Sequence, residues 1–353
     1  SKIMTGDGVI GCVKNSALSG KESVVTPSTL PERVYNHMAM EKSVVMGWHQ
    51  VTNPVANQYI GDLISSAKGL NVISPTWYYL NDNQGAIADF SSAEYVQTAH
   101  NNGIEVWALI SNFENREVNT TAVLNTTSYR DRVVESLITS VIASGADGIN
   151  VDFEGLEYEC KDGFAAFIKE LSIRCEQNGL YLSVDDYPPS EYTSFYGRQM
   201  QADYADYVIL MGYDEYNGAS PVAGPTASLP FVVKGIENTL REVPAERLIL
   251  GMPFYTRVWS NTYGTVTSES MGMATVEEMI AQRGAAKNWL ENDGLNYTEY
   301  MNEDTLIQIW VEDSESLAKK LALIGNYSLG GGAFWKLGLE PASIWDTVAM
   351  YFP

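Results

Sequence analysis

The feature that most limits the fold of this chain is a strand-like stretch at residues 147–154 between two helix-like segments. Along this stretch apolar and polar side chains alternate with a period of two, as in a β-strand. Helical patterns occupy about residues 128–144 before it and 162–178 after it, and each ends close to a glycine. A strand between two helices in a repeating pattern is typical of a parallel sheet, which is covered on both faces. We therefore expect residues 147–154 to be buried on both sides.

The polar face of this strand carries Asn150, Asp152 and Glu154. Burying two carboxyl groups and an amide costs several kcal/mol unless they are paired or have a chemical task. Because a strand inside a parallel sheet meets little water, the polar face indicates a functional strand. A structural role for the two carboxyl groups is the alternative.

Strand-like and helix-like segments alternate along most of the chain. Eight segments have the character of buried strands: residues 44–48, 70–77, 104–110, 147–154, 180–185, 207–214, 247–254 and 331–336. Helical patterns occupy the intervals, and a closing helix is expected at about residues 341–351. Eight strands alternating with helices is the count of a (β/α)₈ TIM barrel. The predicted fold class is therefore α/β with this architecture.

The interval between the seventh and eighth strands is too long for one loop and one helix. It spans about residues 256–312 and contains a helical piece at about 275–291 and strand-like runs at 296–301 and 305–311. Since a loop of this length without structure would be unusual, we predict a small α+β insertion there. With this insertion, the predicted barrel domain occupies residues 43–353.

The first 42 residues do not fit the barrel pattern. Residues 1–20 contain short apolar runs around the turn-like sequence Thr5-Gly6-Asp7-Gly8, which predicts a β-hairpin. This hairpin resembles the closing strands of a small SH3-like β-barrel, and we interpret it as a remnant of one. Residues 21–42 are polar and contain two prolines, so they are predicted to form a linker. The chain begins in mid-pattern without a signal peptide, so we expect it to be part of a longer polypeptide.

Composition argues against several classes of partner. The formal net charge is −22 and the pI is about 4.4, which argues against binding to nucleic acid or to an anionic membrane surface. No stretch is long and apolar enough to predict membrane insertion. The three cysteines (Cys12, Cys160 and Cys175) form no disulfide framework, and the three histidines are widely separated, so we predict no metal and no cofactor. We expect a monomer.

Reactive side chains in a parallel barrel lie at the carboxyl ends of the strands. In this chain those ends carry carboxyl, phenol, indole, hydroxyl and amide groups: Trp48, Trp77, Tyr78, Ser111, Asn112, Asp152, Glu154, Asp185, Tyr213, Asp214, Tyr255 and Trp335. Aromatic rings stack on the apolar faces of sugars, and carboxyl groups bind hydroxyls or donate protons. The predicted rim is therefore a carbohydrate-binding site.

The motif at residues 147–154 also carries a family resemblance. It reads D-G-I-N-V-D-F-E and resembles the D-x-x-D-x-D-x-E signature of glycoside hydrolase family 18, the chitinase-like enzymes, with Asn150 in place of the second aspartate. Followed by Gly155, this variant resembles the branch that contains bacterial spore-cortex and peptidoglycan N-acetylglucosaminidases. The resemblance covers about residues 43–353, with further matching segments at 211–215, 251–259, 309–313 and 334–340.

The resemblance implies a retaining hydrolase that cleaves β-linked N-acetylglucosaminides with help from the acetamido group of the substrate. Glu154 would be the proton donor, and Asp152 would bind the acetamido N–H. Tyr213 would hydrogen-bond the acetamido oxygen. The other pocket residues would be Met211 and Asp214 on its wall and Trp335 on its floor.

Four further residues are expected to contact the substrate: Trp48, Asn112, Asn150 and Tyr255. Packing inside the barrel is the alternative for Trp48 and Tyr255, as it is for Trp77 and Trp107, because large aromatic residues often fill a barrel. Asn150 can hydrogen-bond Asp152 but cannot carry the charge of the aspartate that it replaces. We therefore expect a changed pH profile.

Three more aspartates have structural alternatives. Asp147 stands at the entry of its strand and could be structural or functional. Asp185 could bind sugar hydroxyls or begin a turn before Pro188-Pro189, and Asp186 is assigned to that turn.

The predicted substrate is a polysaccharide that contains N-acetylglucosamine, and the resemblance favours peptidoglycan. Chitin and N-glycan cores are alternatives, and a non-catalytic, chitinase-like sugar-binding protein is the competing class. Such binding proteins typically lack the glutamate that this chain keeps as Glu154. Given this substrate, we expect an exported protein that is extracellular or associated with the cell wall.

Overall fold

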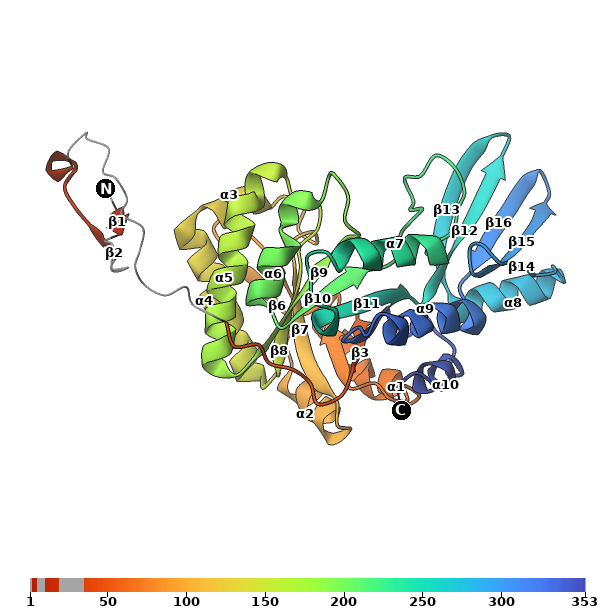
Figure 1. Cartoon of the computed structure of the whole chain (residues 1–353), viewed down its shortest axis with the longest axis horizontal. Helices are drawn as coiled ribbons and strands as arrows, with labels where there is room; N and C mark the ends of the chain where they lie inside the picture. The colour runs from red at the N-terminus through yellow and green to blue at the C-terminus, as the bar shows by residue number, and fades with distance from the viewer. Residues whose placement is uncertain (1, 5–9, 19–34, 353) are drawn as a thin grey trace. The chain divides into compact units, whose positions relative to one another are not determined.

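The computed structural model describes residues 2–4, 10–18 and 35–352 (Figure 1). The chain divides into two units, residues 1–34 and 35–353. In the first unit, β1 (Lys2–Met4) pairs antiparallel with β2 (Ile10–Cys12), and a 3₁₀ turn, η1 (Asn15–Ala17), follows. The turn expected at residues 5–8 and much of the linker expected at 21–42 lie outside the described residues.

The second unit is built on a closed barrel of eight parallel strands. In chain order the strands are β3 (Val44–His49), β4 (Val72–Pro75), β7 (Glu105–Ser111), β8 (Gly148–Asp152), β9 (Tyr181–Asp186), β10 (Tyr207–Met211), β11 (Leu248–Pro253) and β17 (Gly331–Trp335). Each strand pairs with the next, and β17 pairs with β3 to close the ring. The predicted (β/α)₈ barrel is confirmed. A short hairpin, β5 (Tyr78–Leu80) and β6 (Ile87–Asp89), extends beside β7.

Helices surround the barrel (Figure 1). They are η2 (Pro54–Tyr59), α1 (Ile60–Ile64), α2 (Ala93–Asn101), α3 (Thr120–Asn125), α4 (Thr127–Ser144), η3 (Tyr158–Cys160), α5 (Lys161–Asn178), η4 (Ser194–Tyr196), α6 (Arg198–Tyr204), α7 (Leu229–Thr239), η5 (Ala245–Arg247), α9 (Ser314–Asn326) and α10 (Ile344–Ala349). Local sequence sets several ends: Gly145 and Gly179 stop α4 and α5 in the left-handed conformation. Within the described ranges, no helix has the length and apolar character needed to cross a membrane.

The barrel interior is filled by a layer of large side chains. Trp107 stacks against Tyr181 and Tyr207, with ring centroids 5.1 and 5.5 Å apart, and belongs to the core inside the strands. Trp77 is also fully buried, and its indole N–H donates to Oδ1 of Asn57. For Trp77 and Trp107 the structure therefore supports a packing role rather than contact with a substrate.

The predicted insertion follows β11 and is an antiparallel sheet of five strands with one helix. Its elements are β12 (Tyr255–Thr262), β13 (Thr265–Gly272), α8 (Met273–Arg283), β14 (Asn288–Leu290), β15 (Leu295–Asn302) and β16 (Thr305–Val311). The helix is shorter than the expected 275–291 because Gly284 ends it in the left-handed conformation and β14 follows. A buried ion pair ties the insertion to the barrel: Lys320 of α9 contacts Glu312, just after β16, at 2.7 Å.

Candidate active site

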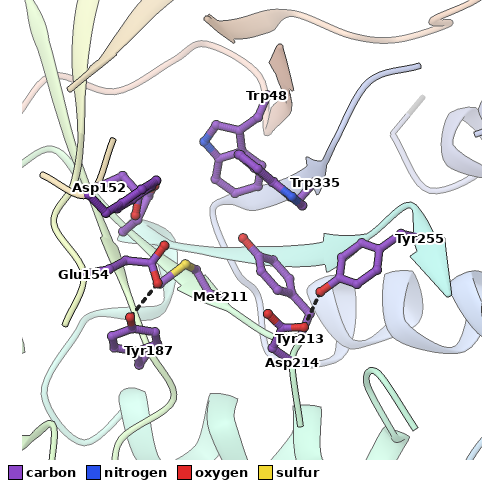
Figure 2. Close-up of a pocket in the computed structure, with 11 residues that line it drawn as sticks. Trp48, Asp152, Glu154, Tyr187, Met211, Tyr213, Asp214, Tyr255 and Trp335 are labelled. Atoms are coloured by element: carbon purple, nitrogen blue, oxygen red, sulfur yellow. Dashed lines mark hydrogen bonds between the residues drawn. The ribbon is translucent and has the colours of Figure 1, made fainter. Parts of the chain in front are cut away.

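The carboxyl ends of the barrel strands surround a cavity of about 180 Å³ (Figure 2). It is lined by Trp48, Phe113, Asp152, Glu154, Asp185, Tyr187, Met211, Tyr213, Asp214, Tyr255 and Trp335. Eight of the ten residues predicted to form the site are among them, and the other two are Asn112 and Asn150. Two wider hollows, of about 560 and 850 Å³, also include Glu154 in their walls. Glu154 therefore stands where three hollows meet.

Asp152 is the last residue of β8, and its side chain is almost fully buried. Its Oδ1 atom has no hydrogen-bond partner among the described residues. Burial raises the pKa of Asp152 well above its ordinary value, and the nearby carboxyl groups of Asp185 and Glu154 raise it further. This carboxyl group therefore has an oxygen available for a polar group of a ligand.

Glu154 lies two residues beyond β8, and its carboxyl group faces the cavity (Figure 2). The hydroxyl of Tyr187 donates a hydrogen bond of 2.5 Å to Oε2 of Glu154. Burial raises the pKa of Glu154, and the carboxyl groups of Asp214 and Glu114 add to this, while the bond from Tyr187 lowers it. A carboxyl group with a raised pKa at the meeting point of three hollows is suited to donating a proton.

Asn112 braces the backbone of Glu154. Its Oδ1 atom accepts from the Glu154 N–H at 2.8 Å, and its Nδ2 group donates to the Glu154 carbonyl at 2.9 Å. Nδ2 also contacts Oγ1 of Thr120 at 3.2 Å. We expected this amide to contact the substrate, but its atoms are engaged with the protein, so we now propose that Asn112 positions Glu154.

Asn150 is fully buried, and protein groups occupy both ends of its amide. Oδ1 accepts from the Trp48 indole at 3.0 Å and from Ser74 at 3.2 Å. Nδ2 donates to Oδ1 of Asp185 at 2.7 Å and to Ser183 at 3.0 Å. The hydrogen bond that an amide at this position could make to Asp152 is not among the contacts of the described residues, because Nδ2 is bound to Asp185 and Ser183.

Asp185 and Asp186 both belong to β9, so the turn assigned to Asp186 is wrong. Successive residues of a strand point to opposite faces. Asp185 lines the cavity, while Asp186 is buried 3.9 Å from the guanidinium of Arg198. Arg198 in turn donates to the Tyr187 carbonyl at 2.9 Å. This buried pair therefore supports the loop that carries Tyr187.

The opposite wall of the cavity comes from β10 and β12. Tyr213 and Tyr255 meet edge to face, with centroids 6.3 Å apart. The hydroxyl of Tyr255 donates to Oδ1 of Asp214 at 2.6 Å, and Arg257 lies 3.6 Å from the same oxygen. Asp214 has a left-handed backbone, with φ at 58°. Burial raises the pKa of Tyr213 well above its ordinary value, so this phenol stays protonated and can donate a hydrogen bond.

Two indoles form the apolar part of the cavity (Figure 2). Trp48 is buried at the end of β3, and Trp335 is half-buried at the end of β17. Their ring centroids lie 5.9 Å apart at an angle of 60°. Met211, the last residue of β10, also lines the cavity. An apolar surface beside several carboxyl groups suits a sugar ring, which has both apolar faces and hydroxyl edges.

The sequence matches glycosyl hydrolases family 18 over residues 36–340. The chain belongs to this family. It is therefore a glycosidase. Among curated relatives, the cortical fragment-lytic enzyme of Bacillus subtilis (strain 168) is 26% identical over 255 residues. The match covers 67% of this chain and 58% of that enzyme, so this family 18 protein aligns with little more than half the length of its relative.

Solved structures of other proteins share the fold. The spore cortex-lytic enzyme SleL from Bacillus megaterium QM B1551 gives a TM-score of 0.76 at 20% identity, over 94% of this chain and 79% of that one. A chitinase from Chromobacterium violaceum ATCC 12472 gives a TM-score of 0.76 at 22% identity, over 88% of this chain and 98% of that one. At these identities the likeness establishes the barrel architecture alone.

Sequence reasoning missed two contacts of this family 18 site. Tyr187 was not considered because its segment, Asp185 to Pro189, has the composition of a turn. Asp185 was considered as a sugar ligand, whereas the structure gives it a protein partner, Asn150. The position of Tyr187, a phenol just after a barrel strand, was the feature of the sequence that could have indicated its role.

Within the described residues, no group of His, Cys, Asp and Glu side chains is arranged to hold a metal ion.

Proposed function

We propose that this glycosidase hydrolyses β-linked N-acetylglucosaminides with retention of configuration, by substrate-assisted catalysis. The observation that carries the proposal is the pairing of one cavity-facing acid, Glu154, with a buried carboxyl group, Asp152, two residues earlier. Retaining glycosidases commonly place a carboxylate nucleophile about 5–5.5 Å from the acid. Asp152 belongs to the barrel wall, so the acetamido oxygen of the substrate is the better nucleophile.

In the first step, the acetamido oxygen attacks the anomeric carbon and the glycosidic C–O bond breaks. Glu154 gives its proton to the leaving oxygen, and burial, which raises the pKa of Glu154, favours the protonated form that this step needs. Asp152 accepts a hydrogen bond from the acetamido N–H and balances the positive charge of the oxazolinium ring. Tyr213 donates to the acetamido oxygen, while Trp335 supports the sugar from below.

In the second step, Glu154 acts as a base. It takes a proton from water, and the oxygen of that water attacks the anomeric carbon from the side that the leaving group vacated. The oxazolinium opens to the N-acetyl sugar. Two inversions at one carbon give net retention.

Asp214 is a poorer candidate for the acid. Its side chain is 48% exposed. Its Oδ1 atom accepts a hydrogen bond from Tyr255 and lies near Arg257. Both contacts hold the carboxyl group of Asp214 against the protein. We assign Asp214 to the wall of the acetamido pocket, as the family resemblance implies.

Peptidoglycan is the substrate that we propose. Two observations support it: the Asn150 and Gly155 variant of the signature, and the name of the Bacillus subtilis relative, a cortical fragment-lytic enzyme. Both chitin and peptidoglycan present N-acetylglucosamine at the reacting position. If peptidoglycan is the substrate, the protein acts outside the cell membrane, in the cell wall or the spore cortex.

The test is hydrolysis of purified peptidoglycan and of a short chitin oligomer by the wild type and by Glu154→Gln. Glu159→Gln, at an exposed carboxyl group five residues further on, is the matched control. Removing the acid should slow hydrolysis by about 10²-fold or more, whereas the control should keep full activity. Proton NMR of the first-formed product should show the β-anomer. A wild type that binds these sugars without cleaving them would make the protein a sugar-binding member of the family and end the proposal.

A further inference from the structure

Two buried carboxyl groups lie side by side on neighbouring strands of the barrel. Val151 of β8 is in register with Val184 of β9, so the next residues, Asp152 and Asp185, also stand opposite each other. Both side chains line the cavity, and the two residues are only 5% and 3% exposed. The titratable and charged groups around this pair therefore decide how much negative charge the barrel can hold.

The titratable groups that face the pair are three carboxyl groups and a phenol, and none of these four is a cation. Glu154 faces both aspartates from beyond β8. Glu114, which follows β7, faces Asp152, and Asp186 on β9 adds to the field at Asp185. The phenol of Tyr213, beyond β10, faces both members of the pair and is neutral.

Cations do not neutralise this charge. Within the described residues, neither aspartate of the pair has an ion-pair partner. Arg257 lies against Asp214, and Arg198 lies against Asp186 on the other face of β9. Two ionised carboxylates on neighbouring strands of a buried site repel each other when no cation lies beside them, so such a pair favours holding one proton. The raised pKa values of both aspartates agree with this.

The orientation of the Asn150 amide shows which member of the pair is fixed. Because Oδ1 of Asn150 receives the Trp48 indole N–H, the Nδ2 group must face the other way, toward Asp185. Asp185 is thereby held at one oxygen by a donor. Oδ1 of Asp152 has no such partner among the described residues. Asp152 is therefore the member of the pair whose oxygen is available to a substrate group.

We propose that Asp152 and Asp185 share one proton, and that Asp185 is a positioning residue that holds this proton while Asp152 binds the substrate. In the free protein the proton bridges the two carboxyl groups. When an acetamido N–H reaches Asp152, the proton stays on Asp185 and Asp152 accepts the N–H as a carboxylate. No proton enters or leaves the pair. This inference rests on the proposed function, because it assigns a partner to Asp152 in that reaction.

The family signature explains why such a partner has to be sought on β9. In the D-x-x-D-x-D-x-E pattern the second carboxyl group stands at the position of Asn150, on the same strand as Asp152. Here that position carries an amide, and the carboxyl group bound to it comes from the next strand. In this chain the second buried carboxyl group therefore lies on β9 instead of β8, and the Asn150 amide holds it by a hydrogen bond.

The test exchanges the two side chains. Asp185→Asn removes the proton-holding carboxyl group without changing side-chain size. The double variant Asn150→Asp/Asp185→Asn restores one carboxyl group and one amide with their positions reversed, and the Trp48 indole keeps an acceptor. Ser183→Ala is the matched control, because it removes the other partner of the Asn150 amide and leaves the charge of the pair unchanged.

We expect Asp185→Asn to lower kcat at least about 10-fold, with little change in KM, and to alter the pH profile of kcat. The double variant should recover most of kcat and the two-carboxyl pH profile, and Ser183→Ala should keep the wild-type profile. If Asp185→Asn has wild-type kcat and pH dependence, or if the folded double variant recovers nothing, Asp185 does not have this role.

Carbon-13 NMR of aspartate-labelled protein gives a readout that needs no activity. In the wild type, the carboxyl signals assigned to Asp152 and Asp185 should titrate as one coupled pair in two separate steps, and in Asp185→Asn the signal of Asp152 should titrate in one step. Independent titration of both at ordinary aspartate values would overturn the proposal. An inert wild type with a coupled titration would defeat the proposed function and leave the shared proton standing.

Discussion

The hydroxyl of Tyr187 donates a 2.5 Å hydrogen bond to the carboxyl group of Glu154, so a residue that follows β9 controls the acid that follows β8. Arg198 holds the carbonyl of Tyr187 and the loop to Thr193. The proton donor is therefore oriented by a chain of contacts that begins on α6. Since a donor to a carboxyl group favours its charged form, this contact also opposes the effect of burial on the pKa of Glu154.

Tyr187→Phe should raise the pKa of Glu154 further, because the hydrogen bond that stabilises the carboxylate is lost. A general acid with a higher pKa stays protonated to higher pH, so the alkaline limb of kcat/KM should move to higher pH. The rate should fall about 10-fold, since a carboxylate is also needed in the second step. The measurement is the pH dependence of kcat/KM.

The matched control for this variant is Tyr192→Phe. Tyr192 lies in the same loop and is 87% exposed. Its pH profile should be that of the wild type. An unchanged alkaline limb in Tyr187→Phe would show that the contact with Glu154 does not set the acid's pKa.

Asn112→Ala should lower kcat by about 10- to 100-fold and leave KM nearly unchanged. The variant removes both hydrogen bonds between Asn112 and the Glu154 backbone, and small misplacements of a catalytic group cost rate steeply. Asn115→Ala is the control, because its amide bonds the carbonyl of Asn81 in the same region and does not touch Glu154. A rise in KM without loss of kcat would instead restore the original expectation that Asn112 binds the substrate.

Trp335→Ala should raise KM and lower kcat/KM by about 10-fold or more, while Trp335→Phe should retain most of the activity. The half-buried indole presents an apolar surface to the cavity, and the apolar face of a sugar gains free energy in proportion to the area that it buries there. Calorimetric titration with a chitin oligomer, using a Glu154→Gln background to prevent turnover, measures the loss directly. If Trp335→Ala and Trp335→Phe bind the oligomer with equal affinity, the ring at this position does not contact the sugar.

Asp186→Asn should flatten the pH dependence of stability. Burial raises the pKa of Asp186 to about 7, although Arg198 opposes the shift. Between about pH 4 and about pH 7 the folded protein holds this proton more tightly than the unfolded chain, so the free energy of unfolding falls as the pH rises through this range. Urea unfolding at several pH values measures the slope, and an identical slope in both proteins would refute the assignment.

The fold could be predicted because its strands are runs of buried apolar residues between helical patterns. The expected strand at 147–154 is shorter in the structure, and β8 ends at Asp152. Its register with β7 stops at Ser111, and beyond that point the Asn112 side chain takes over the backbone of Glu154. Here a side chain makes the hydrogen bonds that the backbone of a neighbouring strand would otherwise make, and such an exchange leaves no periodic pattern in the sequence.

The site could be predicted in part for a similar reason. Asp152, Glu154, Tyr213 and Trp335 stand at strand ends, and the barrel architecture brings those ends together. The partnership of Asn150 with Asp185 depends on the register of two strands and on the direction of one amide. The contact of Tyr187 with Glu154 depends on the path of a loop. These relationships are set by tertiary packing, so spacing along the chain could not reveal them.

The buried ion pair between Lys320 and Glu312 has a consequence for how the second unit comes apart. Each of these two residues is 1% exposed. Separating the insertion sheet from α9 would leave one charge inside without its partner, which costs about 3–5 kcal/mol. The Glu312 N–H also donates to Thr256 of β12, so both ends of the insertion converge on this point. We therefore expect the insertion and the barrel to unfold in one cooperative transition, which scanning calorimetry would record as a single heat-absorption peak.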